Sequence, residues 1–311
     1  ETELTKILAT HKVKLKQIIL VKGTTNVNSL NRALTKEIRQ TYKKIYQEGM
    51  SELNKLAGVS ARYHKSTFGK ALMGIYKAKG INDSIKVNDL IIKGNGTFAQ
   101  QITSISMLQQ KKIINTVKTG MTAGKALNSI ALDVGKLGLL QSTVQTKTLI
   151  RTAITQTSMH VQNMTYALND DVVKGYQYVA TLDTRTSLIC GRLDGKVFSL
   201  NSEFAPKPPQ HFNCRSTTVP IIKSADQLLN TKNNRIKKRK LANISSARRA
   251  SMNGQVPARL NYTTWLGKQT NDTKLTILGS PKRVNIFNQG KLKLTQFSNK
   301  EGKLISLEKL E

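Results

Sequence analysis

Apolar side chains recur every three or four residues through the first half of the chain, which predicts a series of helices. The longest covers about 29–56, and Gly58 is its expected end. Further helices are expected over about 4–19, 60–78, 97–117, 122–138 and 144–168. Between them, the run from Ile81 to Asn95 mixes β-branched residues with turn formers and predicts irregular chain or a short strand.

The apolar stripe of the 29–56 helix has two interpretations. It consists of Leu30, Leu34, Ile38, Tyr42, Ile45, Leu53 and Leu56. Such a stripe either packs into the core of its own chain or forms the seam of a homo-oligomer. The pattern does not separate these two interpretations.

The pattern changes after Asp171. Tyr176, Tyr178 and Ala180 alternate with Gln177, Val179 and Thr181, which predicts a strand, and the sequence from Asp183 to Pro220 is rich in turn formers. A short helix around Trp265, followed by strand-like pieces between glycines, is expected near the end. The fold class is therefore α+β: a mainly helical N-terminal half, a central module with a small sheet and a Pro/Gly-rich loop, and a basic C-terminal extension. The predicted divisions are 1–95, 96–222, 223–260 and 261–311.

The net charge of the chain predicts a binding partner. The 311 residues carry 50 Lys and Arg against 18 Asp and Glu, a formal net charge of +32. Because such a charge opposes compaction, we expect a polyanion to neutralise it, with nucleic acid first and an anionic membrane surface second. The sequence has no apolar run long enough for a membrane span. Its two cysteines exclude a disulfide scaffold and suit a reducing compartment.

The densest basic segment lies near residue 235. The candidate DNA-binding residues are Lys232, Arg235, Lys237, Lys238, Arg239 and Lys240, continued by Arg248 and Arg249. Such a run serves as a nuclear localisation signal, a nucleic-acid contact or a solvated helix face. Together with the overall charge, it favours contacts to DNA phosphates, which carry no sequence preference.

The near-neutral region 151–220 holds both cysteines and four of the six prolines. Asp194 and Gly195 form a strong tight-turn signal. Cys190 on one side and the His211/Cys214 pair on the other resemble two halves of a knuckle that could clamp a metal ion. The prolines between them restrict the loop that brings the halves together.

These residues resemble the motif of the phage Mu F-like minor head proteins, a family of phage head morphogenesis proteins. The family pattern reads Asp-x-Arg-Thr-Cys-x-x-Cys, then Leu-Asp-Gly-Lys-x-Phe, then Pro-Pro-x-His-x-Asn-Cys-Arg-Cys. The matching residues are Asp183, Arg185, Thr186, Cys190, Leu193, Asp194, Gly195, Lys196, Phe198, Pro208, Pro209, His211, Asn213, Cys214 and Arg215. The resemblance extends over about 105–311. Two positions depart from the pattern, because Ser187 and Ser216 stand where the family often has its first and last Cys.

Three interpretations of the Cys/His group stay open. Cys190, His211 and Cys214 bind a metal ion such as zinc as an incomplete ligand set, because serine is a poor zinc ligand. Alternatively, they hold the loop by packing and hydrogen bonds, or the two cysteines form a disulfide. In each case we expect the three side chains to cluster in space.

Catalysis is not expected, because the sequence contains none of the common nucleophile, phosphate-loop or zinc-protease motifs. Asp183, Arg185 and Asp194 are expected to form ion pairs and turn caps, and Gly195, Asn213 and Arg215 complete the structural motif. The alternatives are a metal-dependent nuclease that uses His211 and Asn213, a toxin-type enzyme on the same domain, or a non-viral DNA-binding protein.

The resemblance implies a minor capsid protein of a tailed bacteriophage. It would lie inside the phage head near the portal, after assembly in the host cytoplasm, and would act in head morphogenesis and in genome packaging or ejection. The implied partners are packaged double-stranded DNA and the portal or the major capsid protein, or both. A highly basic, cysteine-poor chain agrees with such surroundings, since packaged DNA would screen its like charges.

Overall fold

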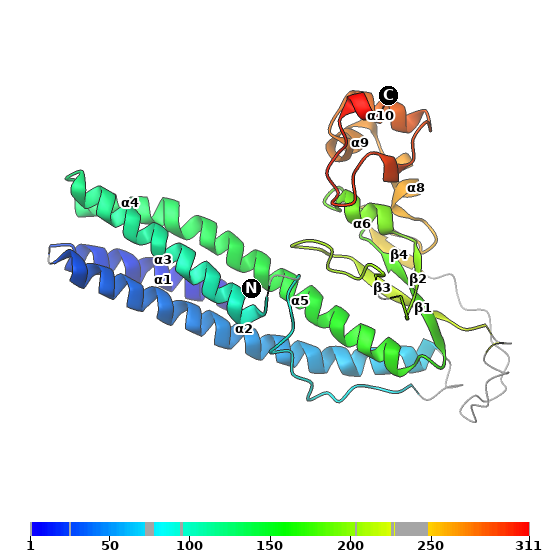
Figure 1. Ribbon diagram of the computed structural model, residues 1–311, viewed down its shortest axis with the longest axis horizontal. Coiled ribbons are helices and arrows are strands. Elements are labelled where there is room, and N and C mark those ends of the chain that lie inside the picture. The colour runs from blue at the N-terminus through cyan, green and yellow to red at the C-terminus, as the bar shows by residue number, and fades with distance from the viewer. Residues whose placement is uncertain are drawn as a thin grey trace. The chain divides into compact units, whose positions relative to one another are not determined.

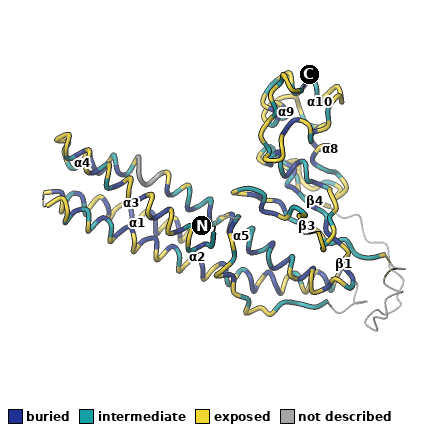
Figure 2. The backbone as a smooth tube through the Cα atoms, viewed as in Figure 1, coloured by how far each residue is buried: buried dark blue, intermediate teal, exposed yellow. Residues whose placement is uncertain are grey.

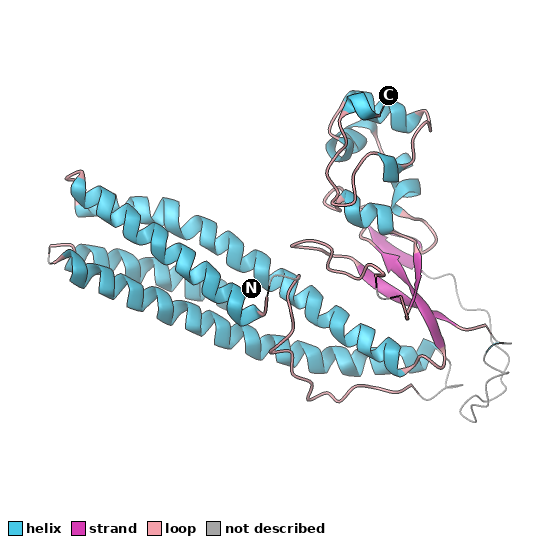
Figure 3. Ribbon diagram, viewed as in Figure 1, coloured by secondary structure: helices cyan, strands magenta, loops and turns pink. Residues whose placement is uncertain are grey.

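The computed structural model describes residues 2–24, 26–71, 78–93, 96–202, 204–224, 227 and 248–310. The chain divides into two compact units that each combine separate stretches of sequence. The first unit consists of Glu1–Val59 and Ser84–Thr157, and the second of Ser60–Asp83 and Ser158–Glu311. The expected α+β class is confirmed, with helices through the N-terminal half and small antiparallel sheets after it (Figure 3).

The first unit is a bundle of long helices (Figure 1). Its helices are α1 (Thr2–Lys22), α2 (Val27–Ala71), α3 (Phe98–Thr122), α4 (Leu127–Asp133) and α5 (Leu140–Leu168), with a π-helical segment over Val134–Leu139. The last turns of α2 and α5 belong to the second unit. The expected stripe on α2 faces the interior: Leu30, Leu34 and Ile38 are fully buried. Figure 2 shows the resulting alternation of buried and exposed positions along the helices.

The predicted end of the second helix at Gly58 is wrong, because α2 continues to Ala71. A glycine inside a helix costs only about 1 kcal/mol relative to alanine. Ala57, directly before Gly58, and Ala61, about one turn after it, are buried, so packing outweighs this cost. The start of α3 follows its local signal, since Thr97 and Gln100 form a capping box.

The second unit contains a three-stranded antiparallel sheet in the order β2-β1-β3. The central strand β1 (Val173–Val179) pairs with β2 (Val197–Ser199) and with β3 (Thr217–Ile222). The predicted alternation is confirmed, as Tyr176 and Tyr178 are fully buried. The end of α5 packs on this sheet: the Gln162 side chain donates to the Thr218 carbonyl at 3.0 Å.

The C-terminal segment is more helical than the sequence predicts. After the hairpin β4 (Arg248–Ser251) and β5 (Gly254–Pro257), the helix expected around Trp265 is present as α8 (Tyr262–Gly267). The strand-like pieces expected next are wrong, because α9 (Asn271–Leu278) and α10 (Pro281–Asn288) follow. Both helices begin at a hydroxyl N-cap, Thr270 and Ser280, and these capping signals decide the local structure.

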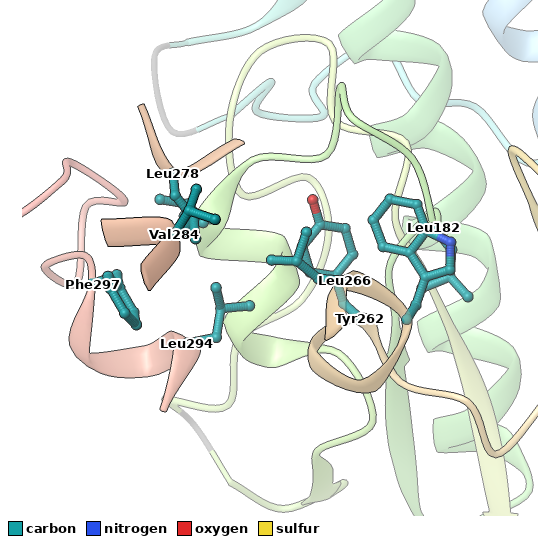
Figure 4. Close-up of a cluster of buried hydrophobic side chains, with 9 residues drawn as sticks. Leu182, Tyr262, Leu266, Leu278, Val284, Leu294 and Phe297 are labelled. Atoms are coloured by element: carbon teal, nitrogen blue, oxygen red, sulfur yellow. The ribbon is translucent and has the colours of Figure 1, made fainter. Parts of the chain in front are cut away.

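One hydrophobic cluster joins this segment to the motif loop (Figure 4). Leu182 and Leu188, which flank the start of the motif, pack with residues from α8 to the end of the chain. The other members are Tyr262, Trp265, Leu266, Leu278, Val284, Leu294 and Phe297. The expected extension is therefore part of the core that supports the motif. None of the described helices is both long and apolar enough to cross a bilayer.

Candidate metal centre

Cys190 is fixed by a short helix, α6 (Leu188–Leu193). Ser187 is the N-cap of this helix, and its side-chain oxygen accepts a hydrogen bond from the Cys190 backbone N–H at 3.4 Å. The residue that stands in place of the family's first cysteine thus satisfies a free backbone donor of the helix. Ser187 therefore caps the helix, and Cys190 on the first turn is fully buried.

His211 and Cys214 lie on a tight turn that faces Cys190. The Cys214 backbone N–H donates to the His211 carbonyl at 3.2 Å, and Asn213 adopts φ of 59°, a left-handed conformation that asparagine tolerates. His211 Nδ1 lies 2.8 Å from the Phe212 carbonyl oxygen. Because a carbonyl only accepts, Nδ1 carries the proton, and in the neutral ring Nε2 presents its lone pair to the cysteines.

The three side chains meet as expected. Cys190 Sγ lies 3.3 Å from His211 Nε2 and 3.6 Å from Cys214 Sγ, and the three candidate ligand atoms lie within 4.8 Å of one another. Two thiolates on a tetrahedral zinc ion, with bonds of about 2.3 Å, would be separated by roughly 3.8 Å. The group therefore has the chemistry and nearly the spacing of a metal site that accepts a soft cation.

The cysteines differ in their acidity. The hydrogen bond between the two thiols, helped by burial, raises the pKa of Cys190. The same hydrogen bond lowers the pKa of Cys214. The pair thus favours a thiolate at Cys214, and thiolate is the form of cysteine that binds metal ions.

Two further hydroxyl groups complete the surroundings of Cys190. Tyr178 Oη lies 3.3 Å from Cys190 Sγ, and Ser216 is hydrogen-bonded to both Cys190 and Tyr178. Burial raises the pKa of Tyr178, so its phenol stays protonated. The alternation along β1 predicted a buried Tyr178, but no local signal in the sequence showed that it would face the thiols.

Asp183 and Arg215 form a bidentate ion pair beside the cysteines. Arg215 Nη1 and Nη2 donate to the two oxygens of Asp183 at 2.6 and 2.7 Å. The Arg185 backbone N–H also donates to this carboxylate at 3.0 Å, whereas the Arg185 side chain is mostly exposed. Burial acts to raise the pKa of Asp183, but its contacts with Arg215 prevail and lower it below the ordinary value.

Asp194 lies at the centre of a second, more deeply buried group. Its side chain is fully buried and accepts hydrogen bonds from the Ala180 N–H at 2.7 Å and from the Tyr262 N–H at 2.6 Å. Arg249 donates to both carboxylate oxygens, at 2.8 and 3.0 Å. With Gly195 at φ of 80° and a 3.0 Å hydrogen bond from the Lys196 N–H to the Leu193 carbonyl, Asp194 is also the second residue of a type II turn.

The candidate DNA-binding residues fall into three groups. Lys232, Arg235, Lys237, Lys238, Arg239 and Lys240 lie outside the described residues. Arg248 is exposed on β4. Arg249 requires a correction: its side chain is only 9% exposed and is bound to Asp194, so it does not face solvent as a phosphate contact would. Arg249 thus belongs to a basic stretch of the sequence but is buried, because Asp194, which is distant in sequence, binds its side chain.

The fold and the site together define a domain in which helices lead into a small sheet closed by a Cys/His loop. Residues 111–219 match the family model described as Phage Mu protein F like protein. The chain therefore carries a domain of the phage Mu F-like head morphogenesis family, which confirms the resemblance and implies a place in the virion. No curated protein and no solved structure matches the chain.

The Asp183–Arg215 pair predicts a specific pH dependence. Because the pKa of Asp183 is lowered in the folded state, its contribution to stability is present above the ordinary pKa of 3.8 and is lost as the pH falls through the folded value. Replacing Asp183 with Asn should therefore destabilise the protein at pH 7, and its difference from the parent should shrink toward pH 3. Urea unfolding at both pH values measures this effect.

Glu301→Gln is the control for the loss of one carboxylate, since Glu301 is exposed. Its difference from the parent should stay within about 0.5 kcal/mol at pH 7. A constant difference between Asp183→Asn and the parent from pH 7 to pH 3 would contradict the assignment.

Proposed function

We propose that the protein is a minor capsid protein of a tailed bacteriophage. It lies inside the head near the portal and acts in head morphogenesis. The observation that carries this proposal is the family match over residues 111–219, which includes the whole Cys/His loop. In this role the second unit is a structural module whose loop is held in one conformation for assembly with the portal or the major capsid protein.

A structural role also fits the state of the carboxylates. Asp183 and Asp194 each accept hydrogen bonds from both Nη atoms of an arginine. The contacts with Arg215 favour the ionised form of Asp183, which is the wrong state for a general acid. His211 has its Nδ1 bound to a carbonyl and its Nε2 directed at Cys190. These residues act as supports for a loop, and we therefore favour a non-enzymatic protein over a nuclease.

Contact with packaged DNA is the second part of the proposal. The net charge of +32 would be neutralised next to a dense polyanion, and the segment Lys232–Lys240 supplies six cationic side chains in nine residues. Such contacts go to phosphates, so we expect binding without sequence preference. This property suits a protein that takes part in packaging or ejection of a whole genome.

Purified virions test the location. Mass spectrometry of intact particles should detect the protein in few copies relative to the major capsid protein, and cross-linking should join it to the portal. The protein should resist added protease in intact heads and become sensitive after the heads are opened, with an exposed capsid protein as the control. Absence from purified virions, or cross-links only to tail proteins, would contradict the proposal.

Zinc is the metal that the Cys/His group fits best, and we propose that Cys190, His211 and Cys214 hold one zinc ion. The support is the donor set, its spacing and the lone pair of His211 Nε2. Elemental analysis should find one zinc per chain in the parent and none in the Cys190→Ser/Cys214→Ser variant. Ser216→Cys should bind zinc more tightly, because it adds a third sulfur, and thus a fourth ligand, next to Cys190.

Ser187→Ala is the matched control. It removes the helix cap and should cost about 1 kcal/mol of stability, but it should leave the zinc content unchanged. A parent protein that neither contains zinc nor takes it up would leave the group as a set of hydrogen-bonded thiols. A nuclease would instead reveal itself by nicking plasmid DNA in the presence of Mg²⁺ or Zn²⁺.

A further inference from the structure

Two adjoining depressions lie along α1 and α2 in the helical bundle. One, of about 720 Å³, is lined by polar and basic residues of α2 alone. The other, of about 250 Å³, lies where α1 and α2 meet. Gln40 lines both, so the two depressions adjoin at this residue, and together they are called the groove. Six basic side chains line it: Arg32, Lys36, Arg39 and Lys44 from α2, and Lys6 and Lys14 from α1.

The basic residues of α2 form a regular row. Arg32, Lys36 and Arg39 are exposed and follow the i, i+4, i+7 spacing, which places them on one face of the helix. They stand about 6 and 4.5 Å apart along the helix axis, and the groove extends about 18 Å along α2 from Arg32 to Lys44. An extended row of this kind suits a linear polyanion better than a compact one, which would need converging donors.

The charge of this groove is not neutralised within the protein. Among the described residues, no carboxylate lies within ion-pair distance of Arg32, Lys36 or Arg39, nor of Lys14 or Lys44. Lys6 pairs with exposed Glu3, at 3.7 Å. The other carboxylate of the groove, Glu37, is 9% exposed and lies within 3.3 Å of His11 and Thr41.

A buried polar network holds the walls of the groove in place. His11 of α1 contacts Glu37 and Thr41 of α2 on one side and Gln109 of α3 on the other, each within 3.3 Å. Gln109 in turn donates to Ser142 of α5 at 2.9 Å. Because these contacts join four helices, the spacing of the lysines on α1 and the basic row on α2 is set before any ligand binds.

We propose that this groove binds the phosphate backbone of duplex DNA. The inference rests on the proposed function, in which the protein contacts packaged DNA, and it assigns that contact to described residues of the bundle. Each strand of duplex DNA carries one phosphate per about 3.4 Å of axis, so a backbone that follows the groove for about 18 Å meets about five phosphates, nearly one for each of the six cations. The contact reads no base and is independent of sequence.

Salt titration of DNA binding by the full chain tests the groove. Four proteins are compared on two unrelated 30-base-pair duplexes by fluorescence anisotropy: the parent, the groove variant Arg32→Gln/Lys36→Gln/Arg39→Gln, a control, and a tail variant. The control is Lys16→Gln/Lys111→Gln/Lys118→Gln, which removes the same charge from exposed positions outside the groove. The tail variant replaces Lys237, Lys238, Arg239 and Lys240 with Gln.

The slope of log affinity against log salt should be flatter by about 2.7 in the groove variant, since each lost phosphate contact removes about 0.9. The control should change it by less than about 1, and Lys36→Gln alone by about 0.9. If the replaced residues of the tail variant also bind phosphates, the slope of this variant should be flatter than that of the parent by up to about 3.6. Circular dichroism checks that each variant is folded, and the single variant serves if the triple one is not.

The outcomes separate the two proposals. A parent that does not bind either duplex overturns the DNA contact of the proposed function. A parent that binds, with equal slopes for the groove variant and the control, overturns the groove and leaves the DNA contact to other residues. A marked preference for one duplex overturns the phosphate-backbone mechanism.

Discussion

The second unit depends on one buried carboxylate. Asp194 is removed from water, and its two oxygens accept hydrogen bonds from the backbone of Ala180 and Tyr262 and from both ends of the Arg249 guanidinium. A buried charge is tolerated only when its partners replace the lost water. The end of β1, the turn before β2, the strand β4 and the start of α8 must therefore assemble around this side chain together.

The residues assembled around Asp194 also position the Cys/His group. Asp194 directly follows α6, which carries Cys190, and Arg215 directly follows Cys214. The Asp194–Arg249 and Asp183–Arg215 pairs thus fix the chain on both sides of the thiols. The hydrophobic cluster of Trp265, Phe297 and their neighbours supports the same loop from the C-terminal segment. This arrangement explains how the three candidate ligands can stay together although the family's first and last cysteines are serines here.

Much of this organisation follows from the sequence, because its signals are local or periodic. The stripe of α2, the alternation of β1 and the Asp194–Gly195 turn each show in a few neighbouring residues. The meeting of Cys190 with His211 and Cys214 was also expected from the motif. Other features depend on contacts between distant segments. Helix α2 continues through Gly58 because the residues near it are packed. Arg249 is buried because it binds Asp194, which lies 55 residues before it in the sequence. The N-caps of α9 and α10, Thr270 and Ser280, are local signals for helices, but the spacing of the glycines favoured a prediction of strands.

A double-mutant cycle between Asp194 and Arg249, measured by urea unfolding, tests the importance of the buried carboxylate most directly. Asp194→Ala and Arg249→Ala should each cost about 3–5 kcal/mol, because each leaves a buried charge without its partner. The double variant should cost clearly less than the sum, with a coupling energy above about 1.5 kcal/mol. Arg248→Ala, the exposed neighbour, should change stability by less than about 0.5 kcal/mol. Additive effects, or an Arg249→Ala variant as stable as the parent, would contradict the central role of this ion pair.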